Sequence, residues 1–212
     1  VAGVTQAAPV TLTTRADAAN LVNLRSQFKA AAASADEVVP TYSDLLLKLT
    51  AAALRQHPLL QGQWRDDGIF VPDHVHIALA VDTDAGLLVP VLRDVDRLTL
   101  RQVAAGSRDL IAQARAGRLT AEQMRGATFT VTNLGMYGID AFTPILHLPQ
   151  AAVLGVGRIV REPAVVGDRV EPREALTLSL TFDHRVVDGA PAARFLDALR
   201  RCVEQPAPYL LP

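Results

Sequence analysis

The chain has 212 residues, a formal net charge of −1 and apolar residues at half of its positions. A chain of this length buries roughly 70% of its unfolded surface on folding, so we expect a single domain, residues 1–212, with a substantial core. The interspersed charges argue against binding to nucleic acid or to a membrane surface, and no apolar run approaches the ~18 residues that suggest a membrane span. The lone cysteine, Cys202, excludes a disulfide framework, and its apolar helical surroundings predict a core residue.

The first third of the chain predicts a strand and two helices. Residues 9–14 alternate as a strand does, and Asp17 is expected to cap a helix that ends in the alanine-rich stretch 30–35. Ser43 is expected to cap a second helix, which His57-Pro58 should end because a proline disfavours helix in the residue before it. The apolar content of this second helix indicates deep burial.

The remainder predicts strands and capped helices around one mixed sheet. An Asp-Gly pair marks a hairpin at 64–70. Capping boxes begin a helix at Thr99, which Gly117 ends, and a short helix at Thr120. Further strands are expected at 75–81 and 87–92, joined through Gly86, and at 128–132, 151–156 and 176–182. Residues 162–174 are expected to form a polar excursion from the sheet, with a turn at Gly167-Asp168. A last helix is expected to begin with Pro191 in its first turn.

A histidine stands at the junction between the last expected strand and the last expected helix. His184 precedes Asp188 by four residues, and Gly189 follows. Functional loops collect at such junctions, and a neutral imidazole near physiological pH can take a proton from a thiol and return it. His184 is therefore a candidate general base. Asp188 either orients His184 or fixes the turn into the helix, and its place before a glycine favours the structural role.

Three further segments, together with the histidine motif, resemble a known family. They are residues 81–91, with Val-Asp-Thr before Gly-Leu-Leu-Val-Pro-Val; 130–138, Thr-Val-Thr-Asn-Leu-Gly-Met-Tyr-Gly; and 149–157, with Pro-Gln-Ala-Ala before Gly-Val-Gly. In this order they resemble the catalytic domain of the dihydrolipoamide acyltransferases of 2-oxo acid dehydrogenase complexes, over about residues 10–211. The resemblance implies an α/β fold of the chloramphenicol acetyltransferase-like kind, a two-layer sandwich with a mixed β-sheet flanked by helices. Other branches of that superfamily usually carry a second histidine where this chain has Asp183.

The resemblance also implies the residues that serve the reaction. Thr132 occupies the position of the hydroxyl that stabilises the oxyanion formed on a thioester carbonyl, beside His184 and Asp188 as the other catalytic candidates. A structural alternative exists, because Thr128, Thr130 and Thr132 alternate along one strand face where β-branched residues are common. The implied contacts of coenzyme A, each with a structural alternative as a strand end, a turn or a core residue, are Asp82, Asn133, Gly157 and Ile159.

One pair of histidines raises the question of a metal site. His74 and His76 would point to the same side of a strand, which suits zinc geometrically. No third ligand or cysteine pair stands nearby in the sequence, and polar residues that alternate with apolar ones are expected on a half-exposed strand. We therefore expect no metal.

The resemblance implies acyl transfer between a dihydrolipoyl arm and coenzyme A. Acetyl is the preferred acyl group, with branched-chain and acetoin-type relatives left open. Two other functions are open to the chain: a core scaffold without efficient catalysis, disfavoured by the intact His184 and Thr132, and a small-molecule acetyltransferase, disfavoured by Asp183 and by residues 130–138.

The implied partners are those of a multienzyme complex. We expect a homotrimer, with His184 and Thr132 contributed across a subunit interface, that assembles into a cubic or icosahedral core with a lipoyl domain, a 2-oxo acid decarboxylase and dihydrolipoamide dehydrogenase. The lipoyl and peripheral-subunit-binding domains of that family have no counterpart in this sequence, and the missing initiator methionine predicts a fragment or a processed product. The expected location is the bacterial cytoplasm, or the mitochondrial matrix of a eukaryote.

Overall fold

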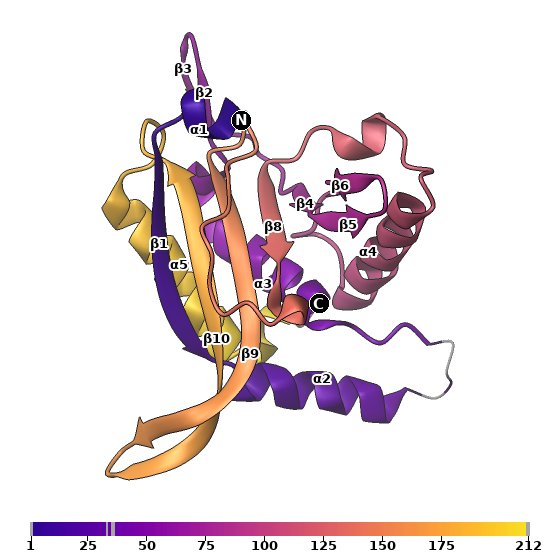
Figure 1. The fold of residues 1–212 in the computed structure, drawn as a ribbon, viewed down its shortest axis with the longest axis vertical. Helices are drawn as coiled ribbons and strands as arrows, with labels where there is room; N and C mark the ends of the chain where they lie inside the picture. Colours follow the sequence, from indigo (N-terminus) through magenta and orange to yellow (C-terminus); the bar gives the residue numbers. More distant parts are fainter. Residues whose placement is uncertain (1, 33, 35–36, 211–212) are drawn as a thin grey trace.

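A six-stranded mixed sheet forms the centre of the computed structural model, which describes residues 2–32, 34 and 37–210 (Figure 1). The strand order is β1-β10-β9-β8-β4-β7. Strands β1, β10 and β9 are antiparallel, β8 runs parallel to both β9 and β4, and β7 is antiparallel to β4. The strands are β1 (Pro9–Asp17), β4 (Ile77–Leu79), β7 (Val91–Leu92), β8 (Phe129–Asn133), β9 (Ala152–Val166) and β10 (Arg169–Asp183).

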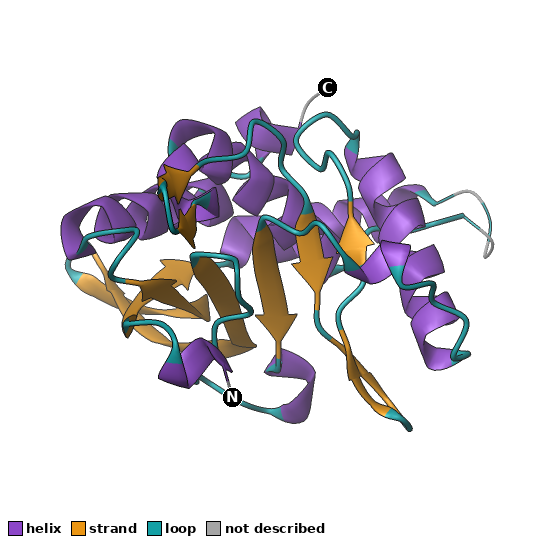
Figure 2. Cartoon of the chain, turned by 90° about the horizontal axis from the view of Figure 1, so that it is seen from above, coloured by secondary structure: helices purple, strands orange, loops and turns teal. Residues whose placement is uncertain are grey.

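The longer helices lie together on one side of this sheet (Figure 2). They are α2 (Ala19–Ala31), α3 (Tyr42–Gln56), α4 (Leu100–Arg115) and α5 (Gly189–Glu204). The shorter elements are α1 (Ala2–Thr5), α6 (Ala207–Leu210), the 3₁₀ helices η1 (Pro58–Gln61), η2 (Glu122–Met124) and η3 (Gly135–Tyr137), and the hairpins β2 (Gln63–Arg65) with β3 (Gly68–Phe70) and β5 (Val81–Thr83) with β6 (Gly86–Leu88). The expected mixed sheet flanked by helices is confirmed.

The core lies between the helices and the sheet. Phe129 of β8 and Phe182 of β10 are fully buried, and the ring of Phe195 in α5 packs 5.8 Å from that of Phe129, centroid to centroid. Helix α3 buries most of its length, as its apolar content predicted. Cys202 is 1% exposed in α5, and burial raises the pKa of its thiol, so the prediction of a core cysteine is confirmed. No helix among the described residues is long and apolar enough to cross a membrane.

Two predicted helix caps are displaced by one or two residues. Thr41, not Ser43, caps α3: its hydroxyl accepts the backbone N–H of Asp44, while the Asp44 carboxylate accepts the N–H of Thr41. Ala18, not Asp17, occupies the N-cap position of α2, although the Asp17 carboxylate accepts the N–H of Ala19 at 2.9 Å. The capping boxes predicted at Thr99 and Thr120 are confirmed, the second on a 3₁₀ helix.

The predicted strands differ from the observed ones in two places. The expected strands 75–81 and 87–92 each divide into a piece of the main sheet and a piece of the β5–β6 hairpin. The division falls at Ala80 and at Pro90, and Pro90 has no N–H to donate to a continuous ladder. The polar excursion expected at 162–174 belongs instead to long strands β9 and β10, whose hairpin extends past the rest of the sheet and turns at the predicted Gly167-Asp168 (Figure 1).

Candidate active site

His184 follows the last residue of β10 and precedes helix α5. Its backbone N–H donates to the carbonyl of Ala8 at 2.9 Å, which ties the junction to the segment before β1. The side chain is 45% exposed, and its Nδ1 lies 3.7 Å from Oδ1 of Asp188. The imidazole is thus open to a substrate while its backbone is held in place.

Asp183 and Arg185 immobilise the chain on either side of this histidine. The Asp183 side chain is 2% exposed; its carboxylate accepts the N–H groups of Ala8 and Arg185, and the Arg185 guanidinium donates to both of its oxygens, the shortest bond being 2.6 Å. Burial by itself would raise the pKa of Asp183, but the hydrogen bonds from Arg185 and Ala8 together lower it. Arg185 also lies over the ring of Trp64 in β2, 5.5 Å from its centroid. Arg185 is therefore paired within the chain.

Asp188 stands at the N-cap position of α5, but its side chain makes no capping hydrogen bond. The carboxylate is 82% exposed and faces His184 instead. The structural role favoured from its place before Gly189 therefore has no side-chain capping bond behind it, and the carboxylate is free to interact with the imidazole.

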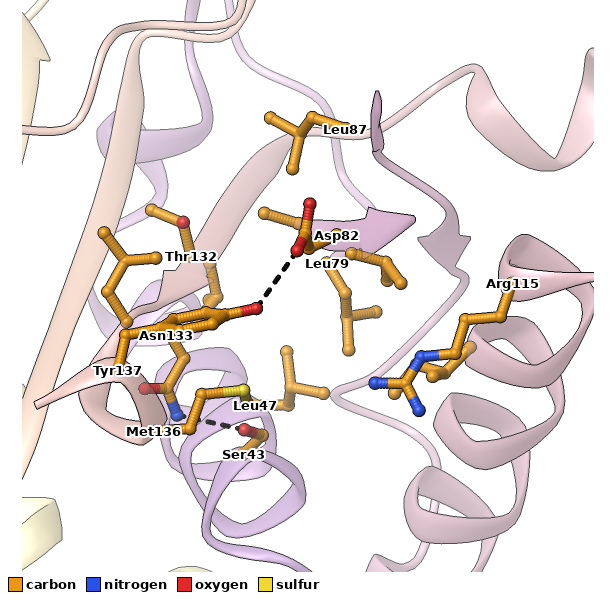
Figure 3. A pocket seen from close by; sticks show the side chains of 15 residues that line it. Ser43, Leu47, Leu79, Asp82, Leu87, Arg115, Thr132, Asn133, Met136 and Tyr137 are labelled. Carbon is orange, nitrogen blue, oxygen red and sulfur yellow. Dashed lines mark hydrogen bonds between the residues drawn. The ribbon is translucent and has the colours of Figure 1, made fainter. Parts of the chain in front are cut away.

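Thr132 lies near the end of β8, where it lines a cavity between β8, the β5–β6 hairpin and η3 (Figure 3). Thr128, just before β8, and Thr130 on it are buried and donate hydrogen bonds to Gln61 at 2.9 Å and Gln150 at 2.6 Å. No side-chain hydrogen bond engages the Thr132 hydroxyl within the part of the chain that the structure describes. The three threonines thus separate into two structural residues and one available hydroxyl.

His184 and Thr132 do not meet within one chain. Thr132 pairs with Gly155 of β9, and Gly155 pairs with Ser179 of β10, five residues before His184. At about 3.3 Å per residue along a strand and about 4.8 Å between strands, the two residues lie on the order of 15–20 Å apart. A single copy therefore does not bring these two candidate residues into one site.

The four predicted coenzyme A contacts gather around two adjoining cavities. Asp82 and Asn133 line the cavity that contains Thr132, while Asn133, Gly157 and Ile159 line the second. The two cavities share three lining residues, Ser43, Asn133 and Met136. Residues from three segments of the chain, β5, β8 and β9, are thus brought to one region.

The segment from Asn133 to Gly138 is held by its own backbone and by close packing. The Asn133 side chain donates to the Ser43 hydroxyl at 3.1 Å and accepts the N–H of Gly135 at 2.8 Å. A Cβ atom on Gly135 would lie 2.6 Å from the carbonyl oxygen of Gly157, so glycine is required there. Gly138 has φ of +79°, a conformation that glycine adopts without strain.

The structure adds cavity residues that the sequence did not single out. Tyr137 of η3 donates its hydroxyl hydrogen to Oδ2 of Asp82 at 3.1 Å, and this hydrogen bond raises the pKa of the phenol. Arg115 at the end of α4 faces the same cavity (Figure 3), and Arg25 of α2 lines the second cavity. Tyr137 lies inside a recognised motif, whereas the arginines stand in ordinary helices with no local signal.

The histidine pair is brought together without a metal-binding arrangement. The rings of His74 and His76 lie 4.1 Å apart, centroid to centroid. Within the described residues, no group of three or more His, Cys, Asp or Glu side chains is placed to hold a metal ion. The Nδ1 atom of His76 instead accepts the backbone N–H of Asp94 at 3.0 Å, so this histidine has a structural partner.

Comparison with known proteins identifies the family. The model of the 2-oxoacid dehydrogenases acyltransferase family (catalytic domain) matches residues 2–211. The chain belongs to this acyltransferase family. The resemblance seen in the sequence is thereby confirmed.

Relatives of this acyltransferase domain come from several 2-oxo acid and acetoin systems. It is 37% identical over 204 residues to the acetyltransferase component of the acetoin cleaving system of Bacillus subtilis, covering 96% of this chain and 51% of that protein. It is 43% identical over 192 residues to the acetyltransferase component of the pyruvate dehydrogenase complex of Pseudomonas aeruginosa, covering 90% of this chain and 35% of that protein. The chain spans about half or less of the length of these curated relatives.

Solved structures of acyltransferase cores share its fold. The dihydrolipoamide acetyltransferase of Azotobacter vinelandii is 39% identical, with a TM-score of 0.94 over 99% of this chain and 86% of that one. The cubic core of a pyruvate dehydrogenase multienzyme complex is 40% identical, also with a TM-score of 0.94 and the same coverage. A chloramphenicol acetyltransferase, 15% identical with a TM-score of 0.55, has the same general fold, as expected.

Proposed function

We propose that this domain transfers an acyl group, preferentially acetyl, between a dihydrolipoyl thiol and coenzyme A. The spacing of three residues carries the proposal. In the Azotobacter vinelandii acetyltransferase, the serine, histidine and asparagine studied for their roles in catalysis are separated by 52 and by four residues. Thr132, His184 and Asp188 have the same separations in this chain, with threonine and aspartate as the corresponding hydroxyl and side-chain oxygen.

The proposed mechanism begins with a proton transfer. Neutral His184 takes the proton from the attacking thiol, because the thiolate is the competent nucleophile and an ordinary thiol has a pKa of ~8.5. The thiolate adds to the thioester carbonyl carbon, and the hydroxyl of Thr132 donates a hydrogen bond to the resulting oxyanion. When the carbonyl re-forms, the bond to the second sulfur breaks, and the departing sulfur takes the proton from the imidazolium. Asp188 stabilises that imidazolium through its charge.

The site needs a second copy of the chain under this mechanism. The separation of His184 and Thr132 within one subunit means that one thioester can contact both only if the hydroxyl comes from a neighbour. A homotrimer provides three such sites by cyclic symmetry. We further propose that trimers assemble into a cubic or icosahedral core that works with a lipoyl domain, a 2-oxo acid decarboxylase and dihydrolipoamide dehydrogenase, in the bacterial cytoplasm or the mitochondrial matrix.

The test is thioester transfer to dihydrolipoamide from acetyl-, isobutyryl- and succinyl-coenzyme A. We expect the highest turnover with the acetyl donor, no turnover for His184→Ala, and turnover reduced by about 10²–10³ for Thr132→Ala, because one oxyanion donor is lost. Faster transfer of another acyl group would reassign the substrate. No transfer by an intact oligomer would favour the scaffold.

Mixing the His184→Ala and Thr132→Ala variants tests whether the site is shared. After the two variants are unfolded together in equal amounts and reassembled, about a quarter of the interfaces should unite an intact His184 with an intact Thr132. The mixture should therefore recover about a quarter of the wild-type activity. If the mixed oligomers stay inactive, both residues must act within one subunit.

A further inference from the structure

Tyr137 and Asp82 stand on opposite walls of the cavity that Thr132 lines (Figure 3). Tyr137 belongs to η3 and Asp82 to strand β5, 55 residues apart in the chain. The phenolic O–H donates to the Asp82 carboxylate at 3.1 Å. A single side-chain hydrogen bond therefore joins two walls that come from different parts of the fold.

The wall that carries Tyr137 is fixed to the main sheet. The N–H of Leu134 donates to the carbonyl of Val156 at 3.0 Å, and the N–H of Gly138 closes η3 on the carbonyl of Gly135 at 3.1 Å. Gly135 packs so closely on Gly157 of β9 that no Cβ would fit between them. The Tyr137 backbone is thus placed by strand β9, and its side chain reaches out from a firm support.

The wall that carries Asp82 has no comparable support for its side chain. The β5–β6 hairpin is a separate two-stranded sheet, and Asp82 is exposed on it. Within the described part of the chain, no other hydrogen bond or ion pair engages the Asp82 carboxylate. Without the Tyr137 hydroxyl, this side chain would be free to adopt several rotamers in solvent.

We propose that Tyr137 is a positioning residue for coenzyme A, which holds Asp82 in the orientation in which its carboxylate accepts a hydrogen bond from the pantetheine arm. The inference rests on the proposed function, which makes coenzyme A a substrate, and on the family resemblance, which implies that Asp82 is one of its contacts. The amide N–H and hydroxyl groups of pantetheine are donors, and a carboxylate is an acceptor only. The Tyr137 hydroxyl uses one of several lone-pair positions on the Asp82 carboxylate, so the others stay available to the substrate.

The expected size of the effect follows from preorganisation. A side chain that is already ordered before binding does not lose its rotamer freedom when the ligand arrives, which typically changes affinity by about 2- to 10-fold. The effect belongs to binding of one substrate, because Tyr137 acts through Asp82 and not on the reacting atoms. A change in KM for coenzyme A, with kcat much less affected, is the expected signature.

The experiment is a double-mutant cycle on the assembled protein, with Tyr137→Phe, Asp82→Ala and both together. We expect Tyr137→Phe to raise the KM for coenzyme A about 2- to 10-fold and to leave the KM for dihydrolipoamide unchanged. In the Asp82→Ala background, Tyr137→Phe should have no further effect, because the residue it positions is gone. Tyr209→Phe, which removes a phenol from the C-terminal helix α6, is the matched control.

Three results would overturn the inference. They are additive effects of the two substitutions, an unchanged KM for coenzyme A in Asp82→Ala, and a change confined to dihydrolipoamide. Calorimetric titration with coenzyme A separates this inference from the proposed function, because it requires no turnover. Binding without coupling between Tyr137 and Asp82 defeats the inference alone, whereas absent transfer by a wild type that binds coenzyme A defeats the proposed function.

Discussion

At His184 the chain combines a fixed backbone with an open side chain. The buried Asp183 carboxylate accepts the N–H groups of Ala8 and Arg185, and Nδ1 of the exposed imidazole lies 3.7 Å from the carboxylate of Asp188. A general base benefits from this combination, because proton transfer requires a defined position as well as access to the substrate. The carboxylate of Asp188 lies close enough to influence the charge of this imidazole during proton transfer.

Substitution of Asp188 should affect catalysis more than folding. The side chain makes no capping bond, so Asp188→Ala should leave the melting temperature close to that of the wild type. An exposed charge pair contributes up to about 1 kcal/mol, so kcat should fall by about two- to fivefold. Asp188→Asn keeps the shape of the side chain and removes its charge, so its kcat should fall by nearly the same factor as that of Asp188→Ala. A drop of several degrees in melting temperature with unchanged kcat would return Asp188 to a structural role.

At the scale of elements, close backbone packing shapes the cavities. The segment that follows η3 lies against β9: a Cβ on Gly157 would stand 1.9 Å from the carbonyl oxygen of Asp140, and one on Gly155 would meet the ring of Phe142 at 3.0 Å. Arg158 fastens the same segment through an ion pair with Asp140 at 2.6 Å. Glycines in β9 therefore allow the segment to approach the strand that carries Gly157 and Ile159.

Gly157→Ala should destabilise the domain. The new methyl group would meet backbone and not a flexible side chain, so the segment must move, and overpacking of this kind costs about 1–3 kcal/mol. Gly189→Ala is the matched control: a Cβ atom added there, at the start of α5, would have no neighbouring atom within 4 Å, and replacing a helical glycine is neutral or gains up to about 1 kcal/mol. Urea denaturation of both variants decides the point. Equal stabilities would show that the segment tolerates displacement.

At the scale of the whole molecule, partly buried histidines make stability depend on pH. The pKa of His76 is lowered by burial and by the neighbouring His74 and Arg93. Asp94 acts in the opposite direction but does not reverse the shift. Burial and then Arg194 lower the pKa of His57. The Nδ1 of His76 also accepts the N–H of Asp94, a bond that protonation of this atom would break. Acid should therefore weaken the folded state through both residues.

The direction of this effect follows from proton linkage. A histidine whose pKa is lower in the folded state binds fewer protons there, so stability falls as the pH drops below the unfolded value of about 6.5 towards the folded one. The lowered pKa of Asp183 adds a further loss at more acidic pH. The urea midpoint should decrease between about pH 7.5 and about pH 5.5, and less so in His76→Asn, whose amide oxygen can accept the same N–H without titrating. Identical slopes for both proteins would contradict the assignment to His76.

Local chemistry determined much of the fold and one half of the site. The capping box at Thr99, the Asp-Gly hairpin turn and the stop at Gly117 were predictable because their hydrogen bonds join residues a few positions apart. The same holds for His184, whose place between a strand and a helix follows from the alternation before it and the proline after it. The cap predicted at Ser43 was wrong because the reciprocal bonds between Thr41 and Asp44 begin α3 two residues earlier.

Contacts between distant residues were decided by the tertiary structure. The extension of β9 and β10 into a long hairpin, the division of the strands around Ala80 and Pro90, and the meeting of Tyr137 with Asp82 depend on partners that no local pattern specifies. The amino-acid sequence by itself indicated the candidate site residues and the elements on which they stand. Only the tertiary structure placed Thr132 far from His184, because strand register and order, set by packing across the whole sheet, fix the distance between them.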